Sequence, residues 1–170
     1  MAKVFKVKYS IFDKEYETQL YPTKEITEQH LFDLQCKGFY NAKIEEKELP
    51  HGSNALILRP DGRILAIKRN HSPIGYGLIG GKVEPGETDE EGLIREVREE
   101  SGLTVVAYQK VFERISVSQK FWVSTYQCLI NGEIKSSSEG EIVWATMQDL
   151  INGPFGVYNK ELFLKLGCII

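Results

Sequence analysis

Residues 80–103 read GGKVEPGETDEEGLIREVREESGL, and this stretch decides how the rest of the chain is interpreted. Thr88 and Glu91 have the T-x-x-E spacing of a capping box, so a helix is predicted to begin at about Asp89. Gly102 stands where a C-terminal glycine cap belongs. Between the caps runs an apolar stripe made of Leu93, Ile94 and Val97. The segment therefore predicts an amphipathic helix that docks on a sheet.

The acidic face of this helix is a candidate metal site. Glu96, Glu99 and Glu100 stand at i, i+3 and i+4, which puts three carboxylates on one face of a helix. Such neighbours repel one another by roughly 0.2–0.5 kcal/mol per pair, whereas a hard divalent cation such as Mg²⁺ or Mn²⁺ reverses the sign of that interaction. An ordinary solvated surface, neutralised by Arg95 and Arg98, explains the same residues without metal. The spacing alone leaves both interpretations open.

The residues before this segment predict a small N-terminal extension. Alternation over residues 4–12 predicts a half-buried strand, and Tyr16 to Leu20 predicts a second one. Thr27 is the expected N-cap of a short helix that ends at Gly38, and a third strand is expected at Phe39–Ile44. Residues 1–48 are therefore expected to form a ββαβ extension, with the charged residues 45–48 as a linker to a second domain at 49–170.

The second domain mixes strands and helices. A glycine-rich stretch, Gly75 to Gly86, precedes the acidic helix, and a tail helix closes the chain. The expected strands are Ala55–Leu58, Ile64–Ile67, Val105–Val117, Phe121–Ile130 and Ile142–Ala145, and the tail helix is Tyr158–Leu166. Short strands around two helices predict a mixed α and β class.

Composition sets further limits on the class of protein. The chain has 170 residues, of which 42% are hydrophobic and 26% charged, with a net charge of −3, and these values are typical of one globular chain with a core of its own. The net charge argues against a broad grip on nucleic acid or an anionic membrane. Three cysteines without CxxC spacing argue against a disulfide framework or a structural zinc site. The N-terminus lacks a signal-peptide pattern and no apolar run could span a membrane, so a cytoplasmic protein is expected.

The whole segment resembles the signature of the Nudix hydrolases, G-x5-E-x7-R-E-U-x-E-E-x-G-U, in which U is bulky and apolar. Seven of the nine positions are fixed identities, and at a frequency of about 7% each they would match one register by chance about once in 10⁸. The chain departs from the family at Ile79, where proline is common, and in its N-terminal extension, which is not part of the compact Nudix fold. The matching residues are Gly81, Glu87, Arg95, Glu96, Val97, Glu99, Glu100, Gly102 and Leu103.

This resemblance implies a fold and a reaction. Nudix proteins are α/β/α sandwiches around a mixed sheet, and they use Mg²⁺ or Mn²⁺ to hydrolyse a nucleoside diphosphate linked to another group. The implied metal ligands are the carbonyl oxygen of Gly80 and the carboxylates of Glu96, Glu99 and Glu100. Glu96 is the expected general base, with Glu99 as the second candidate. Roles in the fold are implied for Gly81 and Gly102 and for a salt bridge between Glu87 and Arg95.

Beyond the signature, the chain most resembles the mutator-type branch, which hydrolyses 8-oxo-dGTP and other nucleoside triphosphates. Arg69 matches a phosphate-contacting arginine, although a strand-end arginine is often only solvated. Glu139 matches an additional metal ligand, although it fits equally a polar loop. Asn159 matches a base-recognising asparagine, although its position also fits the N-cap of the tail helix.

Other substrates and functions use the same acidic face. ADP-ribose, another nucleotide sugar, a dinucleoside polyphosphate and a capped RNA end are alternatives to a nucleoside triphosphate, and the acidic net charge disfavours long RNA. A nucleotide-sensing module without catalysis is a further alternative, but such modules usually lose signature carboxylates that this chain keeps. The N-terminal extension is compatible with a dimerisation arm, a lid or additional sheet, so a homodimer is left open.

Overall fold

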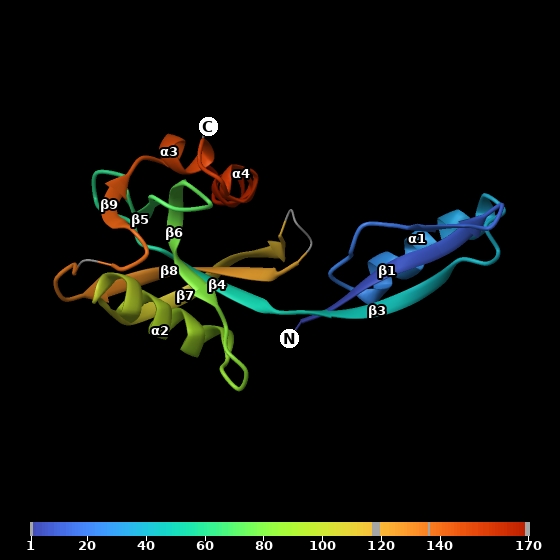
Figure 1. Cartoon of the computed structure of the whole chain (residues 1–170), viewed down its shortest axis with the longest axis horizontal. Helices are drawn as coiled ribbons and strands as arrows, with labels where there is room; N and C mark the ends of the chain where they lie inside the picture. Colours follow the sequence, from blue (N-terminus) through green and yellow to red (C-terminus); the bar gives the residue numbers. More distant parts are fainter. Residues whose placement is uncertain (1, 117–119, 136, 169–170) are drawn as a thin grey trace. The chain divides into compact units, whose positions relative to one another are not determined.

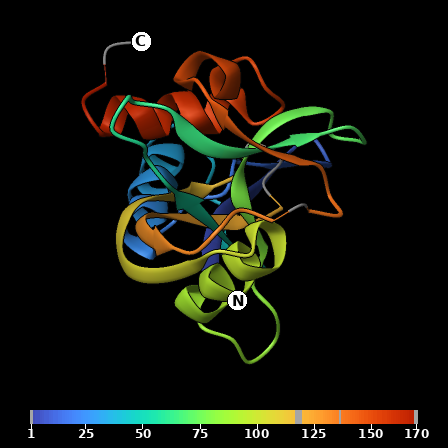
Figure 2. The ribbon, with the colours of Figure 1, turned by 90° about the vertical axis from the view of Figure 1, so that its left-hand side faces the viewer.

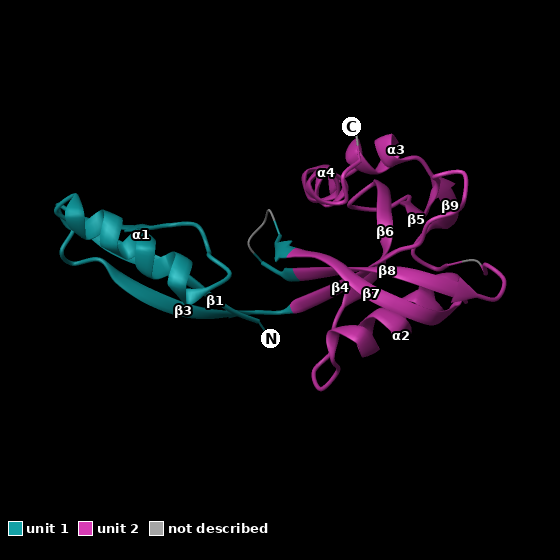
Figure 3. Cartoon of the chain, turned by 180° about the vertical axis from the view of Figure 1, so that it is seen from behind, with its two compact units in different colours: residues 1–50, 114–122 teal, residues 51–113, 123–170 magenta. Residues whose placement is uncertain are grey.

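The computed structural model describes residues 2–116, 120–135 and 137–168. The chain divides into two compact units (Figure 3). The first contains Met1–Pro50 together with Arg114–Trp122, and the second contains His51–Glu113 together with Val123–Ile170. Among the described residues, every helix is too short or too polar to cross a membrane.

The first unit is a three-stranded antiparallel sheet with one helix. Strands β1 (Ala2–Ile11), β2 (Lys14–Glu17) and β3 (Lys43–Leu49) lie in the order β2-β1-β3, and helix α1 spans Lys24–Cys36. One face of β1 is apolar, and its buried Val7 clusters with Leu34 of α1. The other face carries lysines, among them Lys6, whose ammonium lies 2.5 Å from Glu17 Oε2. The alternation in the sequence therefore separates a helix-covered face from a charged one.

Three boundaries in this unit differ from the sequence expectations. The cap of α1 is Thr23, and Thr27 lies buried inside the helix with its hydroxyl donating to the Thr23 carbonyl at 2.8 Å. The expected third strand at 39–44 begins only at Lys43. The charged residues 45–48 form no linker but belong to β3, because Glu45 is paired across the sheet with Lys6.

The second core of this unit includes a segment from far along the chain. Val4 and Leu49 are buried together with Ile115, and Leu20 and Trp122 pack against them. Trp122 also donates its backbone N–H to the Pro50 carbonyl at 3.0 Å. Residues 114–122 thus contribute apolar side chains to the core of the N-terminal unit.

The second unit is a six-stranded sheet between helices. Its strand order is β7-β8-β4-β6-β5-β9, and the pairs β4–β6, β5–β6 and β5–β9 are antiparallel. Figures 1 and 2 show α2 on one side of this sheet and α3 with α4 on the other. The elements are β4 (His51–Leu56), β5 (Ile64–Arg69), β6 (Gly75–Lys82), α2 (Asp89–Ser101), β7 (Thr104–Ile115), β8 (Trp122–Asn131), β9 (Glu141–Ala145), α3 (Met147–Ile151) and α4 (Gly156–Lys165).

Alternating side chains of the same strands fill two cores. On β5, Leu65 and Ile67 face the core that includes Val97 of α2, whereas Ile64 and Ala66 face the core that includes Leu162 of α4. A strand buried on both faces needs apolar residues at every position, which is why residues 64–67 form an unbroken apolar run. The mixed α and β class and the α/β/α sandwich are confirmed.

The acidic helix has the caps that the sequence predicts. Helix α2 spans Asp89–Ser101, Thr88 and Glu91 form a reciprocal capping box, and Gly102 adopts a left-handed conformation with φ 72°. The strand expected at 105–117 is β7, and Val117 lies outside the described residues.

Two expectations about the second unit are corrected. The glycine-rich stretch, to which no strand was assigned, contains β6, whose glycines pair with β4 and β5. The interpretation of Asn159 as an N-cap is wrong, because α4 begins at Gly156 and Asn159 lies within it.

Candidate active site

Helix α2 presents its carboxylates at different depths. The buried stripe of Leu93 and Val97 holds the helix against the sheet, and this sets how far each glutamate is exposed. Glu100 is only 5% exposed, whereas the side chain of Glu99 is 60% exposed. The three glutamates therefore lie in different surroundings although they share one side of the helix.

The first turn of α2 is fastened to the sheet by hydrogen bonds. Ser53 Oγ donates to the Asp89 carbonyl at 2.7 Å, and Ser124 Oγ donates to the Asp89 carboxylate at 3.0 Å. His51 Nδ1 contacts the same carboxylate. These bonds join β4 and β8 to the start of the helix, so they hold the first turn of the helix in place against the sheet.

Two glycines of β6 allow close approach, Gly81 to Glu96 of α2 and Gly80 to the neighbouring strand β4. A Cβ at Gly81 would lie 2.5 Å from Glu96 Oε1, so the Glu96 carboxylate occupies the space that a side chain at position 81 would need. A Cβ at Gly80 would lie 2.2 Å from the Ser53 carbonyl oxygen, and the φ of 146° favours glycine there. The backbone N–H of Gly80 donates to Glu100 Oε2 at 2.8 Å.

Arg95 is the centre of an ion-pair network. Its Nε and Nη2 donate to the two oxygens of Glu87 at 2.8 and 3.0 Å. Nη1 donates to Glu96 at 2.9 Å and to Glu99 at 3.1 Å, and Nη2 also donates to the Lys82 carbonyl at 2.9 Å. The Arg95 hydrogen bonds lower the pKa of Glu87 to about 2. Arg95 thus ties the loop before α2 to the helix and holds Glu96 and Glu99.

Arg69 and Glu139 form an ion pair close to Glu100. Arg69, the last residue of β5, donates from Nη2 to Glu139 Oε2 at 2.6 Å. The same nitrogen lies 4.0 Å from Glu100 Oε1. Arg69 Nε is buried and has no hydrogen-bond partner among the described residues. Three segments of the chain thus bring one guanidinium and two carboxylates together.

The carboxylates influence one another's ionisation. Burial is the main reason that the pKa of Glu100 is raised to about 7; the nearby charges of Glu139 and Glu96 act in the same direction, and the hydrogen bond from the Gly80 N–H opposes them. Burial also raises the pKa of Glu96, against the opposing effect of Arg95. Two carboxylates with pKa values raised by burial lie close to other carboxylates, a combination that is typical of functional sites.

The carboxylates of this site are of the kind that binds a divalent metal ion, although they do not surround one common point in the structure. Within the described residues, no three histidine, cysteine, aspartate or glutamate side chains already form a group that could hold a metal ion. Arg95 holds Glu96 and Glu99, and Arg69 holds Glu139, so these side chains would have to exchange partners. Carboxylate oxygens are the ligands that Mg²⁺ and Mn²⁺ prefer, and the burial of Glu100 near other carboxylates favours a cation beside it.

Asn159 is set apart from these charged side chains. It is 1% exposed in α4, and its Nδ2 donates to the Leu150 carbonyl at 3.0 Å. Sequence reasoning also missed the Lys82 carbonyl as a partner of Arg95, because a backbone atom leaves no signal in the sequence. The pairing of Arg69 with Glu139 depends on strand register and was equally hidden.

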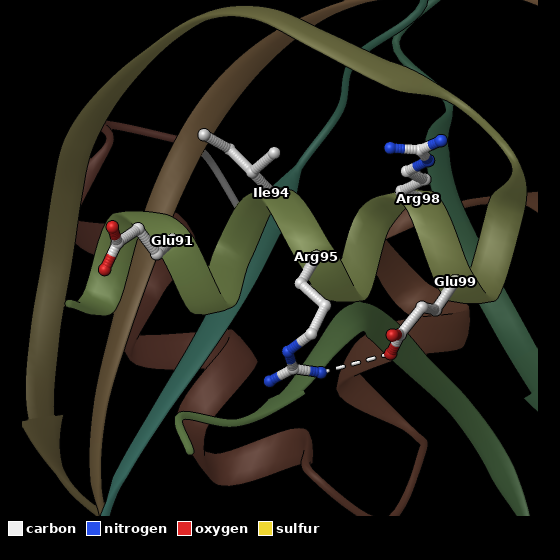
Figure 4. A pocket seen from close by; sticks show the side chains of 5 residues that line it. All are labelled: Glu91, Ile94, Arg95, Arg98 and Glu99. Carbon is white, nitrogen blue, oxygen red and sulfur yellow. Dashed lines mark hydrogen bonds and ion pairs between the residues drawn. The ribbon is translucent and has the colours of Figure 1, made fainter. Parts of the chain in front are cut away.

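A pocket opens on the surface of α2. Figure 4 shows Ile94 and Arg98 on one side of the helix and the ion pair of Arg95 with Glu99 on another. The residues that line it are Glu91, Ile94, Arg95, Arg98 and Glu99. It therefore borders the network through Arg95 and Glu99.

Comparison with known proteins identifies the family. The NUDIX domain model matches residues 49–166. An ADP-ribose pyrophosphatase of Methanocaldococcus jannaschii is 49% identical over an alignment of 116 residues, which covers 64% of this chain and 68% of that protein. A CTP pyrophosphohydrolase of Escherichia coli is 31% identical over an alignment of 110 residues, which covers 59% of this chain and 78% of that protein.

A solved structure agrees with this match. The MutT NUDIX hydrolase from Burkholderia pseudomallei superposes with a TM-score of 0.59 at 26% identity, covering 71% of this chain and 99% of that one. The family model covers the helix with the three glutamates, the glycine pair and the Arg69–Glu139 pair. The chain therefore belongs to the Nudix family of hydrolases.

Proposed function

We propose that this protein is a divalent-metal-dependent hydrolase that cleaves the pyrophosphate linkage of a nucleoside diphosphate derivative. The observation that carries the proposal is the convergence of Arg69, Glu139 and Glu100 beside Gly80, where the pKa of Glu100 is raised to about 7. A pyrophosphate bridge carries several negative charges, so its cleavage needs positive charge at the leaving oxygen and a base for the attacking water.

Five groups are proposed to hold Mg²⁺ or Mn²⁺. When bound, the metal neutralises phosphate charge and lowers the pKa of a coordinated water. Glu96 and Glu100 lie against the glycine pair of β6, which supports a role beside the Gly80 carbonyl. The proposed ligands are the Gly80 carbonyl oxygen and the carboxylates of Glu96, Glu99, Glu100 and Glu139.

The remaining steps are assigned to protein side chains. Glu96 is the proposed general base, because burial raises its pKa and so makes its carboxylate a stronger base. Glu99 is the second candidate, and its greater exposure gives it freedom to reach a water. Arg69 is proposed to bind a phosphate oxygen, which would satisfy its buried Nε.

For the substrate we propose ADP-ribose first and a nucleoside triphosphate second. The relative named ADP-ribose pyrophosphatase shares 49% identity over 116 residues. The nucleoside triphosphate, which the sequence analysis favoured, is supported by the 31% identity to a CTP pyrophosphohydrolase. The proposed contact of Asn159 with the base has less support, because its Nδ2 already donates to the Leu150 carbonyl.

A panel of nucleotides tests this proposal. We expect the purified chain to release AMP from ADP-ribose with Mg²⁺ or Mn²⁺, and to lose activity in chelator. Glu100→Gln should lower turnover by on the order of 10² or more, whereas Glu28→Gln, an exposed glutamate of α1, should not. Full activity in chelator would contradict the metal assignment. Nucleotide binding without turnover of any panel member would instead favour a sensing module.

The cellular setting of the enzyme is also a proposal. We propose residues 49–170 as the catalytic part and residues 1–48 as an accessory part. We propose that the enzyme acts in the cytoplasm and that its substrate is a small nucleotide rather than nucleic acid or a membrane. Whether the accessory part joins two copies is tested by light scattering, with a homodimer as one outcome.

A further inference from the structure

The turn between α3 and α4 lies on two glycines of β6. A Cβ at Gly75 would lie 2.8 Å from Pro154 Cδ, and a Cβ at Gly77 would lie 3.2 Å from Phe155 Cε2. In turn, a Cβ at Gly153 would lie 2.6 Å from the Tyr76 carbonyl oxygen. Residues 153–155 therefore run along the strand at contact distance, which side chains at positions 75 and 77 would prevent.

Phe155 shares a face of the sheet with Arg69. Gly75 is paired with Arg69, and Gly77 is paired with Ile67. Directly opposed residues of an antiparallel pair point to the same face, so the side chain of Arg69 and the missing side chains of both glycines lie on one face. The Phe155 ring is thus seated about 7 Å along the strands from the row of Arg69.

The ring of Phe155 is available for a ligand. Its Cε2 and Cδ2 atoms lie against Gly77, yet the residue remains 41% exposed. Arg69 and its partners Glu139 and Glu100 are among the charged groups on the same face. An exposed aromatic ring beside a phosphate-binding cation suits a nucleotide, because its base can stack while its phosphates reach the arginine.

We infer that Phe155 stacks on the base of the bound nucleotide and is a specificity-determining residue of the site, an inference that rests on the proposed function. Stacking accepts any base because every base has a π-face. Phe155 would therefore distinguish nucleotides from phosphates that lack a base, rather than one base from another.

Asn159 connects the two helices on either side of this turn. Its Nδ2 donates to the Leu150 carbonyl in α3 at 3.0 Å, and its backbone N–H donates to the Phe155 carbonyl at 3.0 Å. The N–H of Gly156 donates to the Gly153 carbonyl at 3.0 Å. The buried amide thus joins α4 to α3 beside the turn that carries Phe155.

Calorimetric binding of two probes tests the inference without turnover. AMP carries a base, and ribose 5-phosphate carries the same sugar phosphate without one. Phe155→Ala should weaken AMP binding by about tenfold, which is typical of the loss of one stacked base, and should leave ribose 5-phosphate binding unchanged. Phe155→Trp should restore AMP binding. Phe155→Leu, which keeps apolar contact with Gly77, should not. Phe32→Ala, which removes an aromatic ring 60% exposed on α1, is the matched control.

The outcomes separate this inference from the proposed function. Equal AMP affinity in the wild type and Phe155→Ala, with both variants folded by their thermal unfolding curves, would overturn the stacking role. A parallel loss for ribose 5-phosphate would also overturn it, since the ring would then only support the fold. Phe155-dependent AMP binding in a protein that hydrolyses no nucleotide would leave the inference standing and would contradict the enzyme assignment.

Discussion

Arg69 Nη2 lies 2.6 Å from Glu139 Oε2, which joins the end of β5 to the loop before β9 across 70 residues of sequence. The pair brings a proposed phosphate ligand and a proposed metal ligand into contact. A cation at Glu139 and a guanidinium at Glu139 repel each other, so one must move when the other binds.

Removal of Arg69 should have opposite effects on metal and substrate. Arg69→Ala frees Glu139 and removes a positive charge 4.0 Å from Glu100, so Mn²⁺ affinity measured by calorimetry should rise severalfold. The KM for the substrate should increase by about tenfold or more, because a charged hydrogen bond to phosphate is lost. Arg59→Ala, which removes an exposed guanidinium paired with Asp61, is the control. Unchanged Mn²⁺ affinity would show that the pair does not oppose the metal.

Alanine at Gly80 should destabilise the protein strongly. The added Cβ would lie 2.2 Å from a backbone oxygen, and the φ of 146° is unfavourable for alanine. Gly38→Ala separates these effects, because Gly38 has a φ of 94° and nothing within 4 Å of its Cβ position. It should cost about 1 kcal/mol for the backbone alone, and Gly80→Ala should cost clearly more. Urea unfolding of both variants measures the difference, and equal midpoints would argue against the close approach of β4.

Glu87 should contribute to stability at neutral pH and lose this contribution in acid. Its pKa is lowered to about 2 in the folded chain by Arg95, below the usual value near 4.5. The unfolded state therefore binds the proton first, and the stabilisation is complete above about pH 4.5 and is lost as the pH falls toward 2. Between pH 6 and pH 3, the urea midpoint should fall less in Glu87→Gln than in the wild type. Glu28→Gln should follow the wild type, and identical slopes in all three proteins would contradict the assignment.

The cysteines should differ in reactivity. Cys36, Cys128 and Cys168 are all free, Cys36 is exposed, and burial raises the pKa of Cys128 to about 11. At pH 8 a thiol reagent should label Cys36 quickly and Cys128 only after unfolding, because the thiolate is the reactive form. Peptide mass spectrometry identifies the labelled sites, with Cys36→Ser as the control. Rapid labelling of Cys128 in the native protein would show that β8 opens readily.

Local signals in the sequence predicted the helix with the acidic face well. The caps at Thr88 and Gly102 act through neighbouring backbone groups, so residues 88–102 carry the whole signal. The start of α1 was placed one turn too late, because Thr23 and Thr27 are both capping residues and only the packing of Thr27 chooses between them. The Nudix signature identified the family from the same short segment.

Features that depend on register could not be predicted. Gly75 and Gly77 are poor strand residues by propensity, and they are tolerated in β6 because residues 153–155 occupy the space of their side chains. The contact of Arg69 with Glu139 needs β9 beside β5, which no local pattern determines. Helix α3, which was not expected, has a capping box of Thr146 and Asp149 that is too short to stand out in the sequence.

The composition of the core of the N-terminal unit affects how this unit folds during synthesis on the ribosome. Val4 and Leu49 share a core with Ile115 and Trp122, so residues 1–50 are synthesised well before two members of this core. At synthesis rates of about 5–20 residues per second, this interval lasts several seconds. During that time Val4 and Leu49 lack the contacts with Ile115 and Trp122 that bury them in the finished protein, and chaperones bind apolar surface exposed in this way. The core of the N-terminal unit is therefore completed only after helix α2 and much of the second sheet have been translated.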